Sequence, residues 1–544
     1  MKKKNYIPMV ITSVVAATLS ACGSSSASSK ATYQKSISWM TTSEIETMDP
    51  NTTVDTASGE QEANTFEGLF RLGKNGKVKP GIAKTAAVSK DGLTWTFTLR
   101  KNAYWSNGEK VTAQDFVYSW QRAVNPKTGA GNTTEYQVIK NAVAITEGKK
   151  SASSLGVKAV GKYKLVVKLV HPVPYFKTTV ASGMYPVSKT AVEKFGKKYG
   201  TASKYQYYDG PFVQKGWTGS NLTWKLVKNK YYWDKQAVKL QTVNYSVEKT
   251  ASTDYNLYQS KKLDAALLDT SAASQLKKSA GYTVRDLDNT YYLNYNIKKV
   301  AIFKNADLRR AISLAINRQA LVNTVGNYNK TAQTMSSASM AIGGQNFAKY
   351  VLSQTDAAKY SKYSKKQAQK YFAAALKKLG KKSISFTIMG DDDDMSKKAV
   401  EYLQSALNAA FGNKINVSVK SLPKTNRISH LMNGTYQLCF MSLTTDAADP
   451  YEFLKYMHSS QTYNFGSWNN SAYDKIVDAS NSASSDKKRL QELAKAEEIL
   501  AKEQGITPLF HLSQAWMIRP NVHGVVFTGS ANDFKTAYAT SENK

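Results

Sequence analysis

The five histidines of this 544-residue chain are the side chains best suited to bind a metal or act as a catalytic base. They stand at positions 171, 430, 458, 511 and 523, and the closest two are twelve residues apart. Two metal ligands on one face of a helix need a spacing of three or four residues, so the chain has no such pair. The sequence therefore predicts no metal site and no cofactor.

Motifs for covalent or nucleotide chemistry are also missing from the sequence. We find no G-x-S-x-G nucleophile turn, no phosphate loop ending in G-K-[ST] and no dinucleotide-binding glycine pattern. The four aspartates at 391–394 lack the glycine and the distal glutamate of a calcium loop, so a solvated turn is the favoured interpretation. A Ser, His and Asp brought together from distant positions stays open. The sequence nevertheless favours a protein that is not an enzyme.

Cys22, one of two cysteines, stands where a lipid could be attached. Three lysines at 2–4 precede an apolar run that is too short to span a bilayer, and this run ends in Leu19-Ser20-Ala21-Cys22. Small residues before a cysteine at this place are typical of a lipoprotein signal. We therefore expect residues 1–21 to be a signal peptide, Cys22 to carry the lipid and residues 22–31 to form a flexible tether. An ordinary secretory signal with a chance cysteine is the alternative.

Cys439, the second cysteine, lies in the apolar run Tyr436–Met441, which predicts a buried strand, and it has no partner for a disulfide.

The net charge of the chain is strongly positive. The formal charge is +34, and it falls to +31 without the three lysines of the signal peptide. Because lysines recur along the whole chain, we predict no nucleic-acid partner and a basic surface suited to an anionic cell envelope. An adhesive role for that surface is the alternative.

Strands and helices alternate along the chain, which predicts the α/β class, and the length predicts two or three domains. Alternating apolar residues predict half-buried strands at 93–99, at 165–169 and at 222–226. Apolar steps of three and four residues predict helices at 305–322, at 364–379 and at 486–504. The last two helices are expected to stop at Gly380 and Gly505.

Several phrases of the sequence resemble the oligopeptide-binding proteins, the large solute-binding lipoproteins of peptide ABC transporters. They are FEGL at 66–69, RKNAYWSNGEKVTAQDFVYSWQRAVNPK at 100–127, DGPF at 209–212, the stretch 288–322, TDAADP at 445–450, WNN at 468–470 with YD at 473–474, and GITPL at 505–509. In the second phrase a hairpin turn at Ser106–Gly108 is expected to lead into a helix capped near Thr112. The resemblance covers essentially all of the mature sequence.

The resemblance implies a two-lobed, periplasmic-binding-protein-like α/β fold of the large peptide-binding type, with an extra subdomain in the first lobe. The core of lobe one is expected at 32–65, 196–293 and 507–544, its subdomain at 66–195, and lobe two at 294–506. Two crossings of the chain between the lobes, near 293 and 506, would act as hinge strands. Ligand would be enclosed between the lobes.

The same resemblance implies the function and the site. The protein would be a monomer that binds oligopeptides, is held at the extracellular face of the cell membrane by its lipid, and delivers its ligand to the permease of an ABC transporter. Asp446 would pair with the α-ammonium group of the peptide, unless it only caps a helix or turn before Pro450. Further residues implied to line the cleft are Tyr136, Tyr292, Asn294, Trp468 and His511.

Other functions remain possible on the sequence alone. The same scaffold could bind another solute, such as a sugar or a metal chelate, or a signalling peptide. A secreted hydrolase or an envelope chaperone is a further alternative from a different class.

Overall fold

The computed structural model describes residues 33–130, 133–326, 328–445, 449–461, 463–483, 485–529 and 531–541. The chain from Tyr33 onward forms one compact unit. The predicted signal peptide, Cys22 and the tether lie outside the described residues, as does Asp446. Within the described ranges, no helix is long and apolar enough to cross a membrane.

Separate hydrophobic cores divide the unit into two lobes. The first core takes buried residues from Ile37 to Ala265 and from Trp516 to Ala539. A second and a third core take theirs from Tyr292 to Phe510. We call the part built on the first core lobe one and the part built on the other two lobe two. The residue boundaries expected for the lobes stay predictions.

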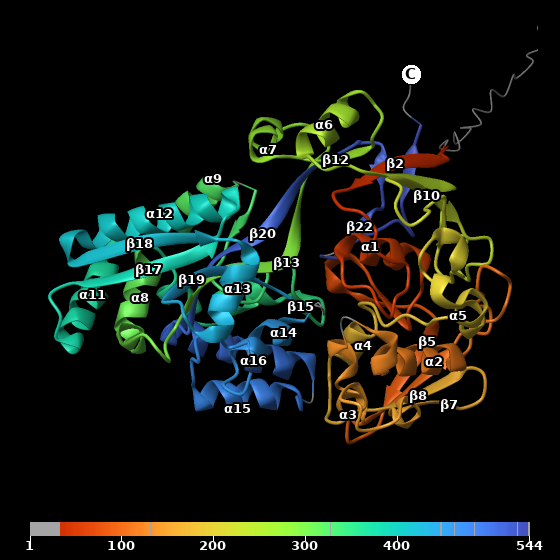
Figure 1. Cartoon of the computed structure of the whole chain (residues 1–544), viewed down its shortest axis with the longest axis horizontal. Helices are drawn as coiled ribbons and strands as arrows, with labels where there is room; N and C mark the ends of the chain where they lie inside the picture. Colours follow the sequence, from red (N-terminus) through yellow and green to blue (C-terminus); the bar gives the residue numbers. More distant parts are fainter. Residues whose placement is uncertain are drawn as a thin grey trace, which may run out of the picture. The chain divides into compact units, whose positions relative to one another are not determined.

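Lobe one contains two four-stranded sheets, which Figure 1 shows with the helices of this half of the chain. One sheet has the order β2 (Ser36–Thr41), β11 (Thr242–Val247), β10 (Thr223–Lys228), β9 (Phe212–Lys215). The other has the order β5 (Ala83–Val88), β6 (Thr94–Leu99), β8 (Lys164–Lys168), β7 (Val157–Ala159). Smaller pairings join β1 (Tyr33–Gln34), β24 (Tyr538–Thr540) and β21 (Val522–His523), then β3 (Phe70–Leu72) with β4 (Val78–Pro80), and β22 (Val526–Phe527) with β23 (Asn532–Asp533). The helices of this part of the chain are α1 (Thr56–Thr65), α2 (Ala113–Val124), α3 (Ala142–Thr146), α4 (Phe176–Thr179), α5 (Lys189–Phe195), α6 (Ala251–Gln259) and α7 (Thr270–Leu276).

A seven-stranded sheet forms the centre of lobe two and reaches toward lobe one. Its order is β12 (Ala265–Leu267), β20 (Ile506–Ile518), β13 (Tyr282–Tyr295), β19 (Leu438–Thr444), β17 (Ile384–Asp391), β18 (Ile415–Leu422), and β14 (Lys330–Thr331) pairs with β20. A separate short hairpin joins β15 (Ala341–Ile342) and β16 (Gln345–Asn346). The helices are α8 (Ala306–Ala315), α9 (Arg318–Val325), α10 (Phe347–Gln354), α11 (Lys365–Leu379), α12 (Asp394–Phe411), α13 (Lys424–Asn433), α14 (Pro450–Leu454), α15 (Ser471–Ser480) and α16 (Asp486–Glu503).

Two long antiparallel strands, β13 and β20, connect the lobes. Their pairing runs from Tyr282 opposite Met517, beside β12, to Asn294 opposite Ile506, inside lobe two. The regular register is interrupted between Asp286 and Thr290. An interrupted ladder bends more easily than a regular one, so this point is a natural place for the two lobes to hinge.

Several sequence predictions are confirmed. The strand expected at 93–99 is β6, and Trp95, Phe97 and Leu99 are buried. Helix α11 begins after its N-cap Ser364 and ends where Gly380 takes a positive φ of 62°. The Ser106–Gly108 turn precedes α2, and Asp115 accepts hydrogen bonds from the backbone and hydroxyl of Thr112 at 2.7 and 2.8 Å.

Other sequence predictions need correction. The single helix predicted at 305–322 is wrong, because Ile316 is extended and the side chain of Asn317 caps a second helix, accepting from Ala320 N at 3.1 Å. Helix α16 stops at Gln504, which takes the left-handed conformation, one residue earlier than predicted. Gly505 serves packing instead, since a Cβ there would lie 2.7 Å from the ring of Trp468.

The structure also gives the surroundings of Leu222, Cys439 and the aspartates at 391–394. Leu222 is exposed, so only Trp224 and Leu226 of the third predicted strand face the core. Cys439 lies fully buried in β19, as predicted. The aspartates at 391–394 do not form a turn alone: Asp391 ends β17, and Asp393 caps α12. Among the described residues, no cluster of His, Cys, Asp or Glu could hold a metal ion.

Candidate functional site

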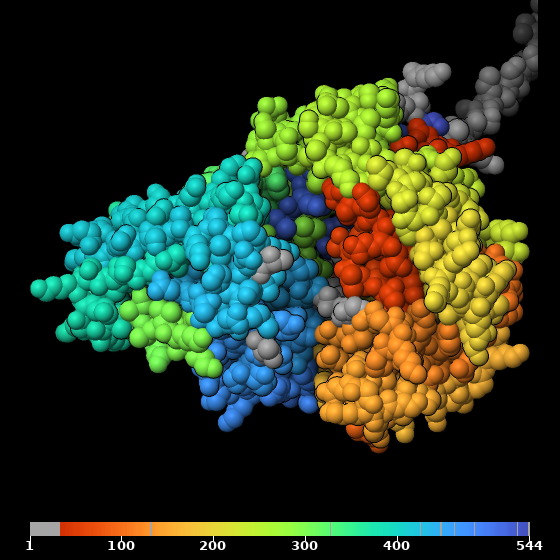
Figure 2. Space-filling view, viewed as in Figure 1, coloured from red at the N-terminus to blue at the C-terminus, as the bar shows by residue number. Residues whose placement is uncertain are grey.

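A cavity of about 300 Å³ lies between residues of lobe one and strands β13 and β19 of the seven-stranded sheet, which we call the connecting sheet. Lobe one contributes residues of the segment 50–63, which includes most of α1, together with β3 and residues 181–185. The connecting sheet contributes Asp288 of β13 and Thr444 at the end of β19, followed by Thr445. Figure 2 shows a hollow beside the residues around α1, with atoms in the colours of β13 and β20 at its floor.

Carboxyl groups dominate the charge of this cavity. Among the described residues, six carboxyl groups and one basic side chain, Arg71, line it; the acids are Asp55, Glu60, Glu62, Glu135, Asp288 and Asp533. Tyr136 and Tyr185 add aromatic rings to the wall. A cavity of this composition favours a cationic group over an anionic one.

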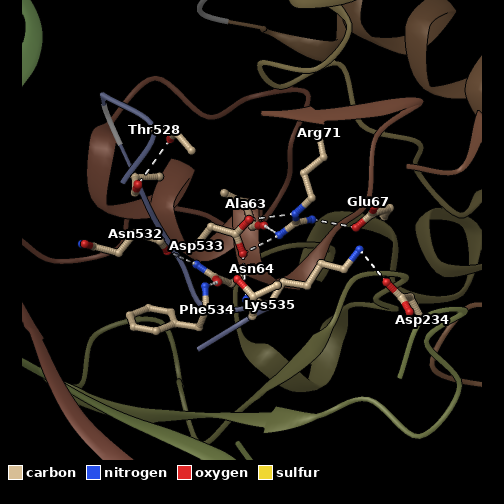
Figure 3. A network of polar contacts seen from close by, with 12 residues as sticks. Ala63, Asn64, Glu67, Arg71, Asp234, Thr528, Asn532, Asp533, Phe534 and Lys535 are labelled. Carbon is tan, nitrogen blue, oxygen red and sulfur yellow. Dashed lines mark hydrogen bonds and ion pairs between the residues drawn. The ribbon is translucent and has the colours of Figure 1, made fainter. Parts of the chain in front are cut away.

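Arg71 is held by a network that ties the C-terminal segment to β3 and α1 (Figure 3). Its Nε and Nη2 donate to the two carboxylate oxygens of Asp533 at 2.9 and 3.0 Å. Its Nη1 donates to Glu67 at 2.6 Å and its Nη2 to the carbonyl of Ala63 at 2.7 Å. Because both carboxylates are largely buried, this forked pairing satisfies charges that would otherwise lie unpaired away from water.

Glu60 and Glu62 project from the same helix and differ in their surroundings. Glu60 accepts a hydrogen bond from the hydroxyl of Tyr245 at 2.7 Å and two from Asn532, at 3.1 and 2.7 Å. Burial raises the pKa of the Glu60 carboxyl against these stabilising contacts. Burial also raises the pKa of Glu62 well above its ordinary value, and the neighbouring Asp49 and Asp55 add to this.

Asp288 lies at the interrupted part of the β13–β20 ladder and is 8% exposed. Burial raises its pKa to about 6, although the hydroxyl of Ser339 donates a hydrogen bond to it. The backbone of Gly529 approaches so closely that a Cβ there would lie 2.3 Å from the Asp288 carboxylate, and Gly529 has a positive φ of 94°. Asp288 therefore connects the hinge region with the C-terminal segment of lobe one.

The predicted ligand contacts do not all meet in this cavity. Tyr136 lines it, packed edge to face on Trp120. Tyr292, Asn294, Trp468 and His511 are outside its lining and each is buried, with 4%, 1%, 4% and 3% exposed. The ligand roles of these residues stay predictions.

The four buried residues all have contacts inside lobe two or the connecting sheet, and Tyr292 belongs to the third hydrophobic core. Asn294 accepts a hydrogen bond from Tyr436 at 2.6 Å, and the ring of Trp468 packs on Tyr473. His511 Nδ1 and the hydroxyl of Thr290 are 3.0 Å apart, and burial lowers the pKa of His511 to about 4. These contacts would hold the side chains in place without a ligand.

Sequence reasoning missed the carboxylates at 55, 60 and 62 and their neighbour Arg71. Acidic residues two and five positions apart carry no pattern by themselves in a chain with 40 of them. The partner of Arg71, Asp533, is 462 residues away. The one feature of the sequence that could have indicated these acids is their clustering just before the FEGL phrase.

The comparisons with known proteins agree on one family. Residues 77–465, more than half of the chain, match the bacterial extracellular solute-binding proteins, family 5 (middle region). A dipeptide-binding protein of Lactococcus lactis subsp. cremoris is 34% identical over 545 residues, which are 96% of this chain and 96% of that protein.

Solved structures share the fold. Listeria monocytogenes OppA bound to peptide is 31% identical and has a TM-score of 0.71, covering 93% of this chain and 99% of its own. MppA, a periplasmic murein tripeptide-binding protein, in its unliganded open form is 26% identical and has a TM-score of 0.82, covering 94% and 99%. Both are two-lobed binding proteins, so the predicted two-lobed α/β fold is confirmed.

Proposed function

Because the chain belongs to family 5 of the bacterial extracellular solute-binding proteins, we propose that it captures oligopeptides between its two lobes and delivers them to the permease of an ABC transporter. The family consists of solute-binding proteins and not of enzymes, as the sequence predicted. The observation that carries the proposal is the cavity lined by residues of both lobe one and the connecting sheet.

The position of the cavity supports a binding mechanism by closure. Asp288 and Thr444 belong to strands of the connecting sheet, and α1 belongs to lobe one. A ligand that touches both sides is bound more tightly when the lobes approach, so it shifts the population toward the closed form.

Asp446 is part of the proposal as the partner of the α-ammonium group of the peptide. Its neighbour Thr445 lines the cavity, whereas Asp449 is engaged elsewhere, because it caps α14 and pairs with Arg489 at 2.6 Å. Asp446→Asn should weaken free peptides strongly and N-acetylated peptides little, measured by calorimetric titration. Equal losses for both peptides would contradict this role.

We include the lipid anchor in the proposal. Cys22 would carry the lipid, and the Gly/Ser segment behind it would let the binding lobes move beside the transporter at the extracellular face of the membrane. Cys22→Ala should prevent incorporation of labelled palmitate and release the protein from the membrane fraction. A variant that stays lipid-labelled and membrane-bound would refute the anchor.

Peptide uptake tests the proposal as a whole. Cells that depend on an external peptide for one amino acid should lose growth when this gene is deleted and regain it with the intact chain. Growth that does not depend on the protein, together with absence of peptide binding in solution, would exclude a transport role for peptides.

A further inference from the structure

The acidic lining of the cavity is not neutralised by its one basic side chain. Arg71 already donates four hydrogen bonds, to Asp533, to Glu67 and to the carbonyl of Ala63. Glu67 and Asp533 together carry more negative charge than Arg71 supplies. The remaining acids of the wall therefore gain no compensation from this arginine.

Glu62 is the most deeply buried of the acids that lack a basic partner. Its side chain lines the cavity, yet the residue is only 3% exposed. One hydrogen bond reaches it, from the hydroxyl of Thr53 to Oε1, and none of the described residues donates to Oε2. No described basic group forms an ion pair with it, and the neighbouring Asp49 is itself paired with Arg122 in a fork at 2.6 and 2.8 Å.

Asp55 presents a second unsatisfied oxygen at the same wall. Its Oδ1 accepts a hydrogen bond from Ser58 N at 2.7 Å and so caps α1. Its Oδ2 is buried and has no hydrogen-bond partner within the described part of the chain. A buried acceptor without a donor costs free energy, which a ligand that supplies a donor would recover.

Aromatic rings complete the surroundings of this pair. Tyr136 and Tyr185 line the cavity, and Glu62 lies near enough to affect the hydroxyl groups of both. Ammonium and guanidinium groups are attracted to the faces of aromatic rings and form strong hydrogen bonds with carboxylates. An anion would be repelled by the same wall, and a neutral apolar group would leave both carboxyl groups unsatisfied.

We propose that Asp55 and Glu62 form a subsite for the basic side chain of a bound peptide, a lysine ammonium or an arginine guanidinium. This inference rests on the peptide-binding function proposed above and adds a preference for cationic peptides to it. Asp55 caps α1 of lobe one and Glu62 lies on this helix. The proposed function gives the α-ammonium group to Asp446 and not to these two carboxyl groups.

Binding of a cation should change the proton affinity of Glu62. The ionisable groups that interact electrostatically with Glu62 are Asp49, Asp55, Tyr136, Tyr185 and Tyr199. Burial raises the pKa of Glu62 well above its ordinary value, and the two aspartates add to this. A cation placed beside the carboxyl group favours the ionised form and lowers this pKa, so a lysine peptide should release more protons on binding than a neutral peptide does.

The test compares tetrapeptides that carry lysine or norleucine at one position in turn, all with a free N-terminus, by calorimetric titration of the mature chain. At one position we expect lysine to bind about tenfold more tightly than norleucine. Glu62→Gln and Asp55→Asn, which keep the hydrogen bond with Thr53 and the helix cap, should each reduce this ratio severalfold. Glu193→Gln, the same charge change on an exposed residue of α5, should leave it unchanged.

Two further experiments identify the cation, and the second uses no variant. N-acetylation should preserve the lysine preference; if the effect of Glu62→Gln disappears with acetylation, the subsite holds the α-ammonium group and the proposal is wrong. Titrations of the unmodified chain in buffers of different ionisation enthalpy, repeated at several pH values, should reveal more proton release with the lysine peptide than with the norleucine peptide. Equal proton release with norleucine would also overturn it.

The failure of the subsite and the failure of peptide binding give different results. Equal, measurable affinities for lysine and norleucine peptides at every position would overturn the subsite and leave peptide binding intact. Absence of binding for every peptide would overturn both.

Discussion

Replacing Arg71 by methionine tests whether the buried ion-pair network holds the C-terminal segment on lobe one. The substitution keeps the apolar stem and removes all four hydrogen bonds to Asp533, Glu67 and the carbonyl of Ala63. The side chains of Arg71 and Asp533 are each 11% exposed, and that of Glu67 is fully buried. The variant thus leaves two carboxylates with little access to water.

The expected loss follows from this burial. Removing one partner of a buried ion pair costs about 3–5 kcal/mol, because the other charge is left uncompensated. A matched control is Lys249→Met, which breaks an exposed pair with Glu44 in which both side chains are more than half exposed. Exposed pairs contribute about 0–1 kcal/mol, so the control should be nearly neutral.

Urea unfolding followed by tryptophan fluorescence is the assay, since buried Trp39 and Trp224 belong to the core of lobe one. We expect the Arg71→Met transition to move to clearly lower urea while the Lys249→Met transition stays near that of the parent. A loss for Arg71→Met no larger than for the exposed control would refute the reasoning that the network is structural.

Three further predictions concern buried groups. Burial lowers the pKa of His511 to about 4, so the unfolded chain takes up a proton before the folded chain does as the pH falls below about 6.5. Between pH 7.5 and pH 5 this should cost the parent about 2 kcal/mol more stability than it costs His511→Gln. His171→Gln, at an exposed position, is the control, and equal pH slopes of urea unfolding for all three proteins would count against the prediction. Gly505→Ala should destabilise the protein by about 1–3 kcal/mol, because the new Cβ overpacks against the ring of Trp468. Gly59→Ala should stabilise the protein by about 0.5–1 kcal/mol, because this position in α1 has open space for a Cβ. Opposite signs of the two effects in thermal unfolding would contradict the packing argument. Burial raises the pKa of the Cys439 thiol to about 12. A chain without residues 1–22, in which Cys439 is the one cysteine left, should therefore react with a thiol reagent only after unfolding. Rapid labelling of the folded protein would show that β19 is accessible and would contradict this prediction.

Local chemistry explains which parts of the fold could be predicted from the sequence. Alternation placed β6 correctly, and Gly380 marked the C-terminal end of α11, because these signals act within a few residues. The break between α8 and α9 was missed, since the apolar spacing continues across Asn317 and only its capping role reveals a new helix. Helix propensity and apolar spacing alone do not distinguish one long helix from two short ones at 305–325.

The candidate site was less accessible to sequence reasoning than the fold. Tyr136 was predicted and lines the cavity, but Glu62 and Arg71 were not singled out. Their importance depends on burial and on partners far along the chain, such as Asp533. The ligand roles of His511 and Asn294 stay predictions, and in the structure both side chains have polar partners inside the protein.

Native mass spectrometry of the mature chain with a mixture of two- to six-residue peptides tests the central claim most directly. We expect one peptide per protein and release of that peptide uncleaved after denaturation. Absence of any peptide complex, or recovery of cleaved peptides in excess of the protein, would contradict a non-catalytic peptide-binding protein.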